Sequence, residues 1–595
     1  MSAGEILRIF ARGFWFDVVT ASLVLLPVVV LGLLISPAFL QKKPGMYLSA
    51  GVQFVLVFLL LFGFVAEHLF WSEFSTRFNF IAVDYLVYTQ EVIGNINESY
   101  PVGWLISAIA VIAAFITRWL LRWQEQFPIA APFRSRALAL MAYGILCLGL
   151  YSASNVGQAD IKNNAIASEV AANGIYNLFS AFWHNEISYE RFYAQQEKSK
   201  VEGHIRGLLS DKNAPFEQKT GIIRTINPPG TERRKNVMIV VMESMSADYM
   251  GAFGNRENLT PNLDAIAKQG LFFTQTYATG TRTVRGLEAV SLSIPPTPGQ
   301  SILRRPENDN LFSLGFIFQD RGYDTKFIYG GYGYFDNMNN FFMGNGFGIL
   351  DRTNMAPEEI HFANVWGVAD DDMFARAIKE ADASYAKGKP FADVIMTTSN
   401  HRPFTYPAGK IDISPKSGRN GGVKYADYSV GKLLEWAKHK PWFKDTIFVF
   451  VADHTAGAGG KAELDAKKYH IPMIFYAPGS IKPQRYESIA SQIDLAPTLL
   501  GQLNFHYRTK FYGEDVLHTN ATPRAFVSNF QKVALVKNGT ITVLAPKRKI
   551  AQFTWPEQTP IGQDQPLADD TIAYYQSASW WKDSYRREPS MLTGK

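Results

Sequence analysis

The sequence predicts a multi-pass α-helical membrane domain followed by an α/β domain outside the cytoplasm. Only 19% of the 595 residues are charged, against about a quarter in an ordinary soluble domain. The first quarter of the chain is almost free of charge, and from residue 236 onward short apolar runs alternate with helical segments. A chain of this length is also too long for one ordinary core, so two or three domains are expected.

Four long apolar runs lie ahead of residue 159. They cover residues 18–40, 46–66, 102–121 and 137–158, and only the third contains a charged residue, Arg118. Each is close to the ~20 residues that a helix needs to cross a bilayer core. Four such runs in one region favour membrane helices over buried soluble helices, and the first run is too long for a cleavable signal peptide.

A fifth crossing is a weaker candidate. The stretch 78–96 would place Asp84 and Glu91 in lipid, where charged side chains are costly. We therefore predict four or five membrane helices.

Arginines set the predicted topology. The loop between the last two runs holds four of them: Arg118, Arg122, Arg134 and Arg136. Such a loop is typical of the cytoplasmic side, so the chain after about residue 159 is expected to face the periplasm or the cell exterior from an inner (plasma) membrane. Arg8 and Arg12 also favour a cytoplasmic N-terminus, and an inside start with an outside finish requires an odd number of crossings.

Composition divides the chain into four parts. Residues 1–158 form the predicted transmembrane domain, and residues 159–230 form a polar helical connector that we interpret as a solvated spacer. Residues 231–522 form the α/β domain, and residues 523–595 form a C-terminal subdomain with short strands at 524–537 and 540–544.

Six short apolar runs predict the strands of the α/β domain: 236–242, 271–277, 325–329, 394–397, 447–452 and 472–476. Several are apolar at consecutive positions, as in central strands that are covered on both faces. Helical segments such as 261–269 and 425–439 lie between them, and this alternation predicts a mostly parallel sheet. Sites in such sheets form at the carboxyl ends of the strands.

Acidic and imidazole side chains follow two of these strands. Glu243 follows the first, in VMIVVMES, and Asp453 and His454 follow a later one, in IFVFVADH. Two strands of one sheet can bring these residues to one point. Carboxylate oxygens and an imidazole nitrogen there suit Zn²⁺, Mn²⁺ or Mg²⁺, and the nitrogen favours the first two. A strand-end aspartate alone is more often a helix cap, so the two strand ends together are stronger evidence than either.

The segment ATGTRTVRGLEA, residues 278–289, combines a flexible turn with reactive and cationic groups. It contains two glycines, two threonines and two arginines: Gly280, Gly286, Thr281, Thr283, Arg282 and Arg285. The glycines allow a tight turn, a hydroxyl beside a metal can attack phosphorus or sulfur, and guanidinium groups hold charged oxygens. Without the acidic strand ends, a polar turn with solvated arginines would be the better interpretation.

His401 follows another predicted strand, in TTSNHRPF, and is expected at the same edge of the sheet. An imidazole there can bind a phosphate oxygen or protonate a leaving group. His470, just ahead of the strand 472–476, is equally well explained by a structural role.

Composition also excludes several classes of protein. Cys147 is the only cysteine, so an intramolecular disulfide and a thiolate metal cluster are both impossible. The net charge of +6 is small for this length and gives no case for a nucleic-acid partner. An aromatic content of 14% excludes general disorder.

With these residues assembled, the chain resembles the lipoteichoic acid synthase group of membrane phosphoglycerol transferases, in the sulfatase-like part of the alkaline phosphatase superfamily. The resemblance covers the whole plan of membrane helices, connector and α/β domain. In the α/β domain it rests on six ordered segments: NVMIVVMES (236–244), LTPNLDAIAKQGLFFTQTYATGTRT (259–283), WGVADDDMF (366–374), SNHRPF (399–404), VADH (451–454) and IPMIFYAPG (471–479).

The resemblance implies a metal-dependent, sulfatase-like catalytic domain in residues 231–522. Four residues match the family's metal site: Glu243, Thr283, Asp453 and His454. Thr283 matches the threonine that contacts the metal and acts as the nucleophile, with Thr281 as the alternative because the two threonines leave the alignment ambiguous. His401 matches the histidine that contacts the glycerol-phosphate group.

The chain also departs from the family pattern. The segment that begins at Tyr334 reads YFDNMNNFF, with Asp336 and Met338 where the family has a tryptophan and an arginine near the substrate. The segment TRTVRGLE differs from the family's threonine followed by serine and aspartate, and it adds Arg285. Arg282, Arg285 and Asp336 are therefore expected to bind substrate, and the identity of the head group stays open.

The implied reaction has two steps. The Thr283 hydroxyl attacks the phosphodiester of a membrane phospholipid, with phosphatidylglycerol as the expected donor, and diacylglycerol stays in the bilayer. An acceptor hydroxyl on a glucan or a growing glycerol-phosphate polymer then attacks the phosphoglyceryl-threonine. One divalent ion is expected as the cofactor, Mn²⁺ first, with Zn²⁺ and Mg²⁺ as alternatives.

Three other functions fit parts of the sequence. A phosphoethanolamine transferase acting on lipid A or glycan belongs to the same superfamily, but such enzymes generally have disulfides in this domain. A sulfatase needs a Cys-x-Pro-x-Arg or Ser-x-Pro-x-Arg nucleophile segment, and the segment here has neither. A membrane sensor or binder without turnover would not need the set of Glu, Thr, Asp and His.

Overall fold

The computed structural model describes residues 3–588 except 75, 80–81, 84–88, 127–130, 160, 162–164, 184–186, 457–463 and 518–521. Its contacts divide the chain into two units. The first contains residues 1–185 with 460–462, and the second contains residues 186–459 and 463–595. The predicted fifth membrane candidate, 78–96, falls partly outside the described residues, and its described end lies in helix α5 (Thr89–Ser99).

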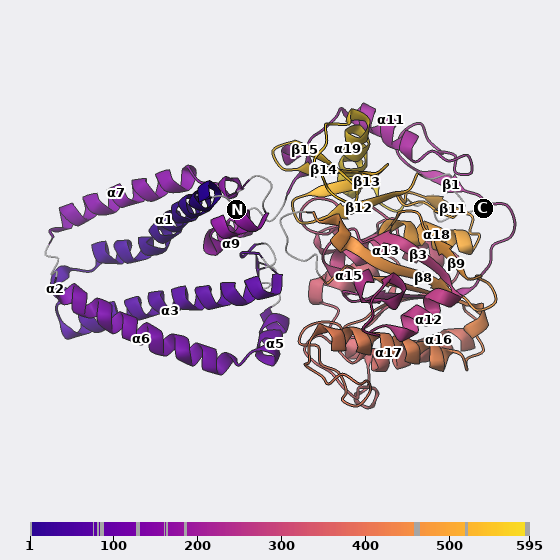
Figure 1. Ribbon diagram of the computed structural model, residues 1–595, viewed down its shortest axis with the longest axis horizontal. Helices are drawn as coiled ribbons and strands as arrows, with labels where there is room; N and C mark the ends of the chain where they lie inside the picture. The colour runs from indigo at the N-terminus through magenta and orange to yellow at the C-terminus, as the bar shows by residue number, and fades with distance from the viewer. Residues whose placement is uncertain are drawn as a thin grey trace. The chain divides into compact units, whose positions relative to one another are not determined.

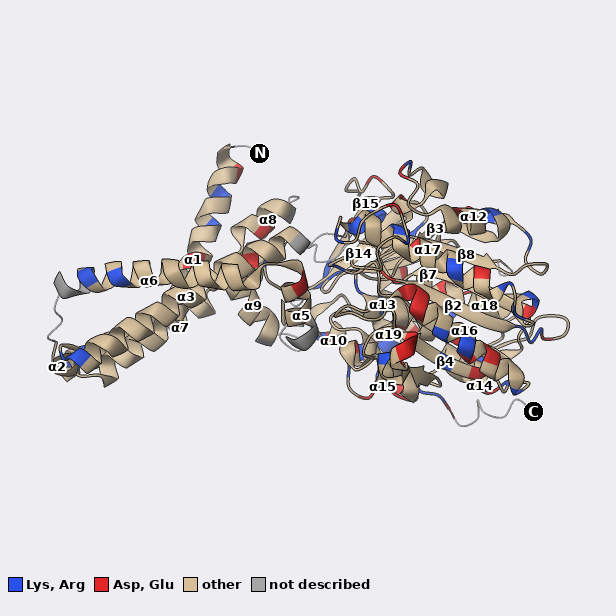
Figure 2. Ribbon diagram, turned by 90° about the horizontal axis from the view of Figure 1, so that it is seen from below, with Lys and Arg blue, Asp and Glu red and all other residues tan. Residues whose placement is uncertain are grey.

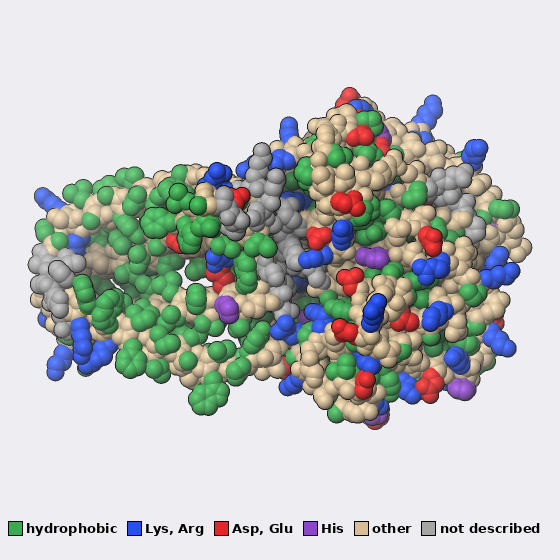
Figure 3. All heavy atoms as spheres, in the orientation of Figure 1, with side chains coloured by type: hydrophobic (Ala, Val, Ile, Leu, Met, Phe, Trp, Pro, Cys, Tyr) green, Lys and Arg blue, Asp and Glu red, His purple; other side chains and the backbone are tan. Residues whose placement is uncertain are grey.

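Four helices of the first unit are long and apolar enough to cross a membrane, judged by length and composition among the described residues. They are α1 (Ala3–Leu34), α3 (Lys43–Phe74), α6 (Val102–Gln126) and α7 (Phe133–Ser152), with the short α2 (Pro37–Leu40) between α1 and α3. Charged residues are sparse along these helices (Figure 2), and apolar side chains cover the visible surface of the unit (Figure 3). Helices that are apolar all round are typical of membrane spans, which confirms the predicted multi-pass helical part.

Helices α1 and α7 pack against each other in antiparallel directions. Near the start of α7, Arg136 donates from Nη1 to the carbonyl oxygens of Gly32 and Ile35 at the end of α1, both at 2.8 Å. One to two turns further along α7, the Tyr143 hydroxyl donates to the carbonyl oxygen of Ser22. Arg136 thus satisfies carbonyls that the end of a helix leaves unpaired, where the helix dipole also favours a cation.

The predicted connector is shared between the two units. Helices α8 (Ala165–Ala171) and α9 (Gly174–Trp183) pack on α1 in the first unit. Helices α10 (Tyr189–Phe192) and α11 (Lys198–Leu208) pack on α19 (Gln565–Ser579) in the second. The described helices of this stretch therefore contribute to packed cores, whereas a solvated spacer would not.

A nine-stranded sheet forms the centre of the second unit (Figure 1). Its order is β10-β3-β8-β7-β2-β6-β4-β5, with β9 beside β3. The strands are β2 (Asn236–Met242), β3 (Leu271–Tyr277), β4 (Asp324–Tyr329), β5 (Gly348–Leu350), β6 (Phe391–Met396), β7 (Thr446–Ala452), β8 (His470–Tyr476), β9 (Gln484–Tyr486) and β10 (Ala490–Ser491).

The apolar runs of the sequence become the central strands of this sheet. β2 reads NVMIVVM, and all of its residues are buried because it lies between its parallel neighbours β6 and β7. All six predicted strands are present, with ends shifted by a few residues. The sheet is mostly parallel, as predicted: six of its eight strand pairings are parallel. The exception is β8, which pairs in antiparallel fashion with both β7 and β3.

Helices cover both faces of the sheet (Figure 1). Helices α12 (Pro261–Gln269), α16 (Asp370–Ala386) and α17 (Arg419–Ala437) pack together on one face. Helices α13 (Thr283–Leu292), α14 (Leu314–Gln319) and α18 (Leu495–Gln502) form the group on the other. This two-sided cover explains why so many strand residues are apolar at consecutive positions.

A second, antiparallel sheet follows near the C-terminal end of the described chain. It contains β12 (Arg524–Ser528), β13 (Val533–Lys537), β14 (Thr540–Ala545) and β15 (Lys549–Thr554). Helix α19 packs on β13 and β14, and β12 contacts β3 and β10 of the main sheet. The short strands predicted at 524–537 and 540–544 are therefore present, and they extend the core of the α/β unit.

Candidate active site

The acidic residues predicted at two strand ends meet at one edge of the main sheet. β2 and β7 are parallel neighbours with Met242 opposite Ala452, so the residues that follow them, Glu243 and Asp453, leave the sheet side by side. His454 comes next, and the three side chains bring ligand atoms within 4.8 Å of one another. The structure thus brings together the three residues that the strand ends single out as ligands.

His454 is oriented by its backbone neighbour. Its Nδ1 lies 2.9 Å from the carbonyl oxygen of Thr455, and because a carbonyl only accepts, Nδ1 carries the hydrogen in this arrangement. Nε2 then presents its lone pair to the acids, 3.3 Å from Asp453 Oδ2 and 3.9 Å from Glu243 Oε1. A histidine that ligates a metal is commonly held in this way by its other nitrogen.

Asp453 has one satisfied oxygen and one unsatisfied oxygen. Its Oδ1 accepts from the backbone N–H groups of Ser244 at 2.8 Å and His454 at 2.7 Å. Its Oδ2 is buried and has no hydrogen-bond partner, which is costly unless a ligand compensates it. An unpartnered carboxylate oxygen beside a second carboxylate and an imidazole lone pair fits a divalent cation.

The two acids differ in their electrostatics. Burial, and after it the charge of Glu243, raises the pKa of Asp453 well above its ordinary value. Burial also acts to raise the pKa of Glu243, but the nearby His454 and His401 outweigh it, so that pKa is lowered. Two adjacent buried carboxylates resist ionising together, and a bound cation would relieve that conflict.

Thr283 is the first residue of α13, and its hydroxyl donates to Glu243 Oε2 at 3.2 Å. Thr281, the alternative nucleophile, is buried and makes no hydrogen bond to the three ligand residues in the described part of the chain. The first turn of α13 approaches the end of β7 closely, because a Cβ at Gly286 would lie only 2.4 Å from the carbonyl oxygen of Asp453. The geometry therefore favours Thr283 over Thr281 as the reacting hydroxyl.

The two arginines of this turn have separate environments. Arg282 caps the start of α13, and its charge lowers the pKa of His454, after the larger effect of burial. Arg285 lies 3.0 Å from Glu288 Oε1 and donates to two backbone carbonyls at 2.6 Å each. Arg285 is buried within the first turn of α13, so it is engaged internally and does not take the substrate-binding position expected for it.

His401 lies at the same edge on an aromatic support. Its ring is 3.7 Å from that of Trp366 between centroids. His401 Nδ1 and Trp366 Nε1 lie 3.1 and 2.6 Å from the same carbonyl oxygen, that of Arg402. Burial lowers the pKa of His401 to about 4, so the ring is neutral near pH 7 and its Nε2 is a hydrogen-bond acceptor. It is better suited to accept from a hydroxyl than to protonate a leaving group.

Backbone N–H groups anchor the loop that carries His401. Asp370, at the start of α16, accepts from the N–H groups of Thr398 at 2.8 Å and Ser399 at 3.1 Å. Asn400, which the sequence does not single out, donates from Nδ2 to the carbonyl oxygen of Glu243 at 2.9 Å. The loop after β6 is thus fastened directly to the end of β2.

Arg419 is a second residue that the sequence does not single out. It begins α17, lies over the ring of Phe404 at 4.8 Å, and approaches the carbonyl oxygen of Asn400 at 3.4 Å. Its charge acts on His401, where it adds to the lowering of the pKa that burial causes. Arg282 and Arg419 have no carboxylate partner within the described residues, and the charges of both act on His401 and His454.

Asp336 and His470 have structural partners. Asp336 is buried with φ of +53°, and its Oδ1 lies 3.5 Å from Arg304 Nε. This pairing with a guanidinium differs from the substrate contact that the resemblance implied. His470 Nε2 lies 2.9 Å from the carbonyl oxygen of Thr274, which supports a structural role for that histidine.

The site therefore combines a hydroxyl, a cluster of cation ligands and two unpaired guanidinium groups. A hydroxyl of this kind suits covalent catalysis on a charged centre. Guanidinium groups suit the non-bridging oxygens of a phosphoryl or sulfuryl group and stabilise charge on them during transfer. The geometry alone supports group transfer on either kind of centre.

Known proteins with related sequences and folds match this part of the chain. Residues 235–505 match the model of the family described as sulfatase. A solved structure of a protein in the alkaline phosphatase superfamily from Vibrio parahaemolyticus is 33% identical with a TM-score of 0.63, and the match covers 67% of this chain and 100% of that chain.

Two other relatives carry names for a reaction. Phosphoglycerol transferase I from Xanthomonas campestris pv. campestris is 26% identical over 322 residues, which are 50% of this chain and 45% of the relative. The chain thus spans less than half the length of that protein. The crystal structure of a lipoteichoic acid synthase from Listeria monocytogenes is 18% identical with a TM-score of 0.53, covering 65% of this chain and 100% of that one, and this likeness bears on the fold alone.

Proposed function

The chain belongs to the sulfatase family of the alkaline phosphatase superfamily, and from this premise we propose that it is a membrane-anchored phosphoglycerol transferase. The donor is phosphatidylglycerol, and the acceptor is an extracytoplasmic glucan or glycerol-phosphate polymer. The observation that supports this proposal most strongly is the Thr283 hydroxyl, hydrogen-bonded to Glu243 beside the unpartnered oxygen of Asp453. The 26% identity to phosphoglycerol transferase I supports the choice of phosphoglycerol.

Glu243, Thr283, Asp453 and His454 would hold one divalent ion, for which we favour Mn²⁺ over Zn²⁺ and Mg²⁺. When bound, such an ion supplies Lewis-acid polarisation and charge compensation at the transferred group. The unpartnered Asp453 Oδ2 and the lone pair of His454 Nε2 support this assignment.

In the first step, the Thr283 oxygen forms a bond to phosphorus. The bond between phosphorus and the diacylglycerol oxygen breaks, the Thr283 proton leaves to solvent, and diacylglycerol takes up a proton. In the second step, an acceptor hydroxyl oxygen attacks the same phosphorus, and Thr283 leaves and regains its proton. Covalent catalysis of this kind divides one difficult displacement into two easier ones.

Arg282 and Arg419 hold the non-bridging oxygens of the phosphoryl group in both steps. The charges of both guanidinium groups act on His401 and His454, and charge-assisted contacts to phosphate are among the strong hydrogen bonds. Neutral His401 accepts a hydrogen bond from a glycerol hydroxyl at Nε2, because its Nδ1 is already turned to a backbone carbonyl. These residues position the substrate, and positioning is a large part of catalysis in phosphoryl transfer.

The four candidate membrane helices support a lipid donor, since the diacylglycerol product stays in the bilayer. We place the α/β unit on the periplasmic or exterior side because Arg118, Arg122, Arg134 and Arg136 favour the cytoplasmic side for the loop between the last two spans. With the four candidate spans, this choice puts the N-terminus on the same exterior side, against the expectation from Arg8 and Arg12.

Intact-protein mass spectrometry after incubation with phosphatidylglycerol, without an acceptor, tests the proposal. We expect a phosphoglyceryl adduct on the peptide that contains Thr283, and no adduct in Thr283→Ala. Lipid turnover by that variant should fall by about 10³-fold or more. Thr281→Ala is the matched control and should keep both the adduct and most of the turnover.

Two results would contradict the assignment. Full lipid turnover by Thr283→Ala would show that Thr283 is not the nucleophile. An adduct that is lost only in Thr281→Ala would show that Thr281 is the nucleophile. Parallel incubation with phosphatidylethanolamine decides the head group: an adduct from that lipid alone would make the chain a phosphoethanolamine transferase.

A further inference from the structure

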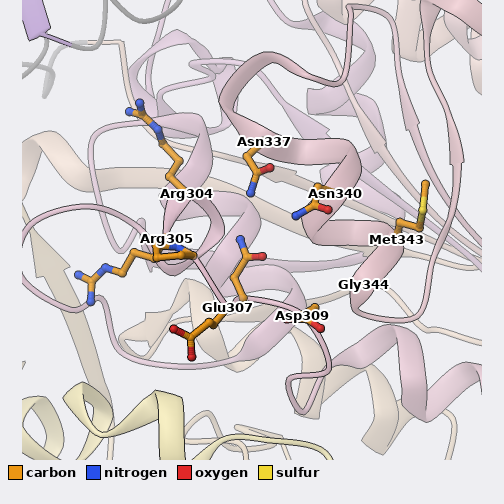
Figure 4. Close-up of a pocket in the computed structure, with 10 residues that line it drawn as sticks. Arg304, Arg305, Glu307, Asp309, Asn337, Asn340, Met343 and Gly344 are labelled. Carbon is orange, nitrogen blue, oxygen red and sulfur yellow. The ribbon is translucent and has the colours of Figure 1, made fainter.

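A cavity of about 700 Å³ opens beside the loop that begins at Tyr332. Ligand pockets typically have volumes of about 300–1,000 Å³. Its lining comes from two segments, 304–309 and 337–344. Asn337 and Asn340 point toward the open space from one side, while Arg304 and Arg305 extend away on the other (Figure 4).

The charged groups of this cavity are compensated within the protein. Arg304 lies 3.5 Å from Asp336, and Arg305 donates to the backbone carbonyl oxygens of residues 298 and 300. Glu307 lies 3.6 Å from Lys582 Nζ, and Asp309 lies 3.7 Å from an Arg586 nitrogen. An anionic polymer would therefore have to compete with these internal partners for the two guanidinium groups.

Hydrogen-bonding capacity remains on the asparagines. The Asn340 side chain is exposed and makes no hydrogen bond within the described residues. Asn337 donates from Nδ2 to the carbonyl oxygen of Leu303 at 3.0 Å, which leaves its Oδ1 available. An amide both donates and accepts, so a wall of amides matches hydroxyl groups, which do the same.

Exposed aromatic rings continue this surface toward the catalytic edge. Tyr332 and Tyr334 are 37% and 53% exposed, and their rings lie 6.1 Å apart at 26°. Phe335, the next residue, packs at 5.5 Å on Trp366, which is the ring beneath His401. Rings of this kind present an apolar face and a polar edge, which suits the alternating C–H and O–H faces of a sugar.

We propose that this cavity and the Tyr332–Tyr334 pair bind a segment of a neutral, hydroxyl-rich glycan and so hold the acceptor beside the site. This inference rests on the proposed function for its role as an acceptor site. The paired charges argue against a glycerol-phosphate polymer as the occupant, and two ring contacts connect the cavity wall to His401. The glycan is thus delivered to the side of the site that the Trp366–His401 stack forms.

The test is direct binding of a neutral glucose hexasaccharide to the full chain in detergent, without lipid donor, by calorimetry or saturation-transfer NMR. A synthetic glycerol-phosphate hexamer is the comparison ligand. We expect saturable binding of the glucose hexamer only. Asn340→Ala should weaken it about fivefold through the loss of its hydrogen bonds, and Asn340→Trp should abolish it by filling the cavity.

Asn213→Trp, at an exposed loop position in the same unit, is the matched control and should bind as the wild type does. Melting temperature and metal content establish that each variant is folded. If Asn340→Trp does not fold, the binding measured for Asn340→Ala tests the inference. Absence of hexasaccharide binding, binding unchanged in both Asn340 variants, or binding of the glycerol-phosphate hexamer alone would each overturn the inference. The binding test contains no lipid donor, so its result does not depend on the adduct test. If the hexasaccharide binds but no adduct forms on Thr283, the glycan site is supported and the proposed function is contradicted.

Discussion

Two clusters of buried charge in the α/β unit are alike in burial and opposite in how their oxygens are satisfied. In the first, which we call the paired cluster, Arg524 Nη1 lies 3.1 and 3.2 Å from the two oxygens of Asp494. Each of those oxygens also accepts from a backbone N–H group, of Glu514 and Ser491, both at 2.9 Å. In the second, the open cluster, Asp453 Oδ2 has no hydrogen-bond partner.

The difference separates a structural use of charge from a functional one. A buried ion pair with every carboxylate oxygen bonded fixes the geometry of the fold and needs nothing else. A buried carboxylate with an empty oxygen, next to a second acid and an oriented imidazole, is incomplete without a cation. The two clusters differ in whether every carboxylate oxygen has a hydrogen-bond partner. Burial and residue type do not distinguish them.

Asp453→Asn is the most direct test of the difference between the two clusters. The amide keeps an oxygen for the N–H groups of Ser244 and His454 but removes the charge of the open cluster. We expect bound metal to fall to background and lipid turnover to fall by about 10³-fold or more. Elemental analysis of the purified chain and a lipid-turnover assay measure the two effects. Metal and turnover at wild-type levels would show that the open cluster is not the metal site.

Arg524→Met should be the next largest effect, on stability rather than on metal. It leaves Asp494 buried without its cation, which costs about 3–5 kcal/mol. The thermal unfolding midpoint of the full chain in detergent is the readout, and metal content per folded protein should stay unchanged. Arg508→Met, at the half-exposed pair with Glu217, is the control and should cost about 1 kcal/mol or less. Equal losses in the two variants would remove the distinction between the clusters.

Arg419→Gln tests whether an unpaired guanidinium beside the open cluster serves the substrate. We expect kcat/KM to fall by about 10- to 100-fold through lost charge-assisted contacts to phosphate, with little change in melting temperature. Arg285→Gln should behave in the opposite way, because it strands buried Glu288 and lowers the melting temperature. If Arg419→Gln also unfolds the protein and leaves kcat/KM intact, its role is structural.

The smallest predicted effect concerns Asp393 on β6, which is buried with neither side-chain oxygen hydrogen-bonded. Burial raises the pKa of Asp393 to about 8, with Lys326 opposing it. The unfolded chain ionises at the ordinary, lower pKa, so this group's contribution to stability is complete below that value and is lost as pH rises toward 8. Asp393→Asn cannot ionise, so its gain in stability over the wild type should increase steadily as pH rises from 5 toward 8.

Unfolding midpoints across that pH range measure this gain. Asp412→Asn is the control, since the bond from Lys424 lowers the pKa of Asp412 and its removal brings no gain at higher pH. A constant difference between Asp393→Asn and the wild type at all pH values would contradict the raised pKa.

Strand-end reasoning reached the main parts of the site because their positions follow from sheet topology. Glu243, Asp453 and His454 come directly after apolar runs, and parallel neighbours end at the same edge. The apolar helices and the α/β fold were also predictable, because the length and the apolar periodicity of a segment are local properties of the sequence. The sheet is mostly parallel, as predicted, but the antiparallel direction of β8 depends on a connection that apolar patterning does not report.

The sequence did not predict which arginines remain available to bind a substrate. Arg282 and Arg285 look equivalent in the sequence, but Arg282 is the N-cap residue ahead of α13, whereas Arg285 is buried in the helix and pairs with Glu288. Arg419 follows a loop that ends in Gly418, with no strand directly before it, and its only signal is its place at the start of α17. Asp336 is committed to Arg304 by tertiary packing. Which cations remain unpaired is a property of the folded chain.

Gly286 has a consequence for how this protein can diversify. Because any side chain there would collide with the backbone of Asp453, the helix that begins at Thr283 and the strand that ends in the acids form a single inflexible block. The loop of residues 332–344 is built separately, because the ring contacts described above join it to Trp366 and His401 and not to that block. Substitutions in the loop can therefore change what the protein recognises without changing the residues that react. At position 286, in contrast, no residue larger than glycine fits.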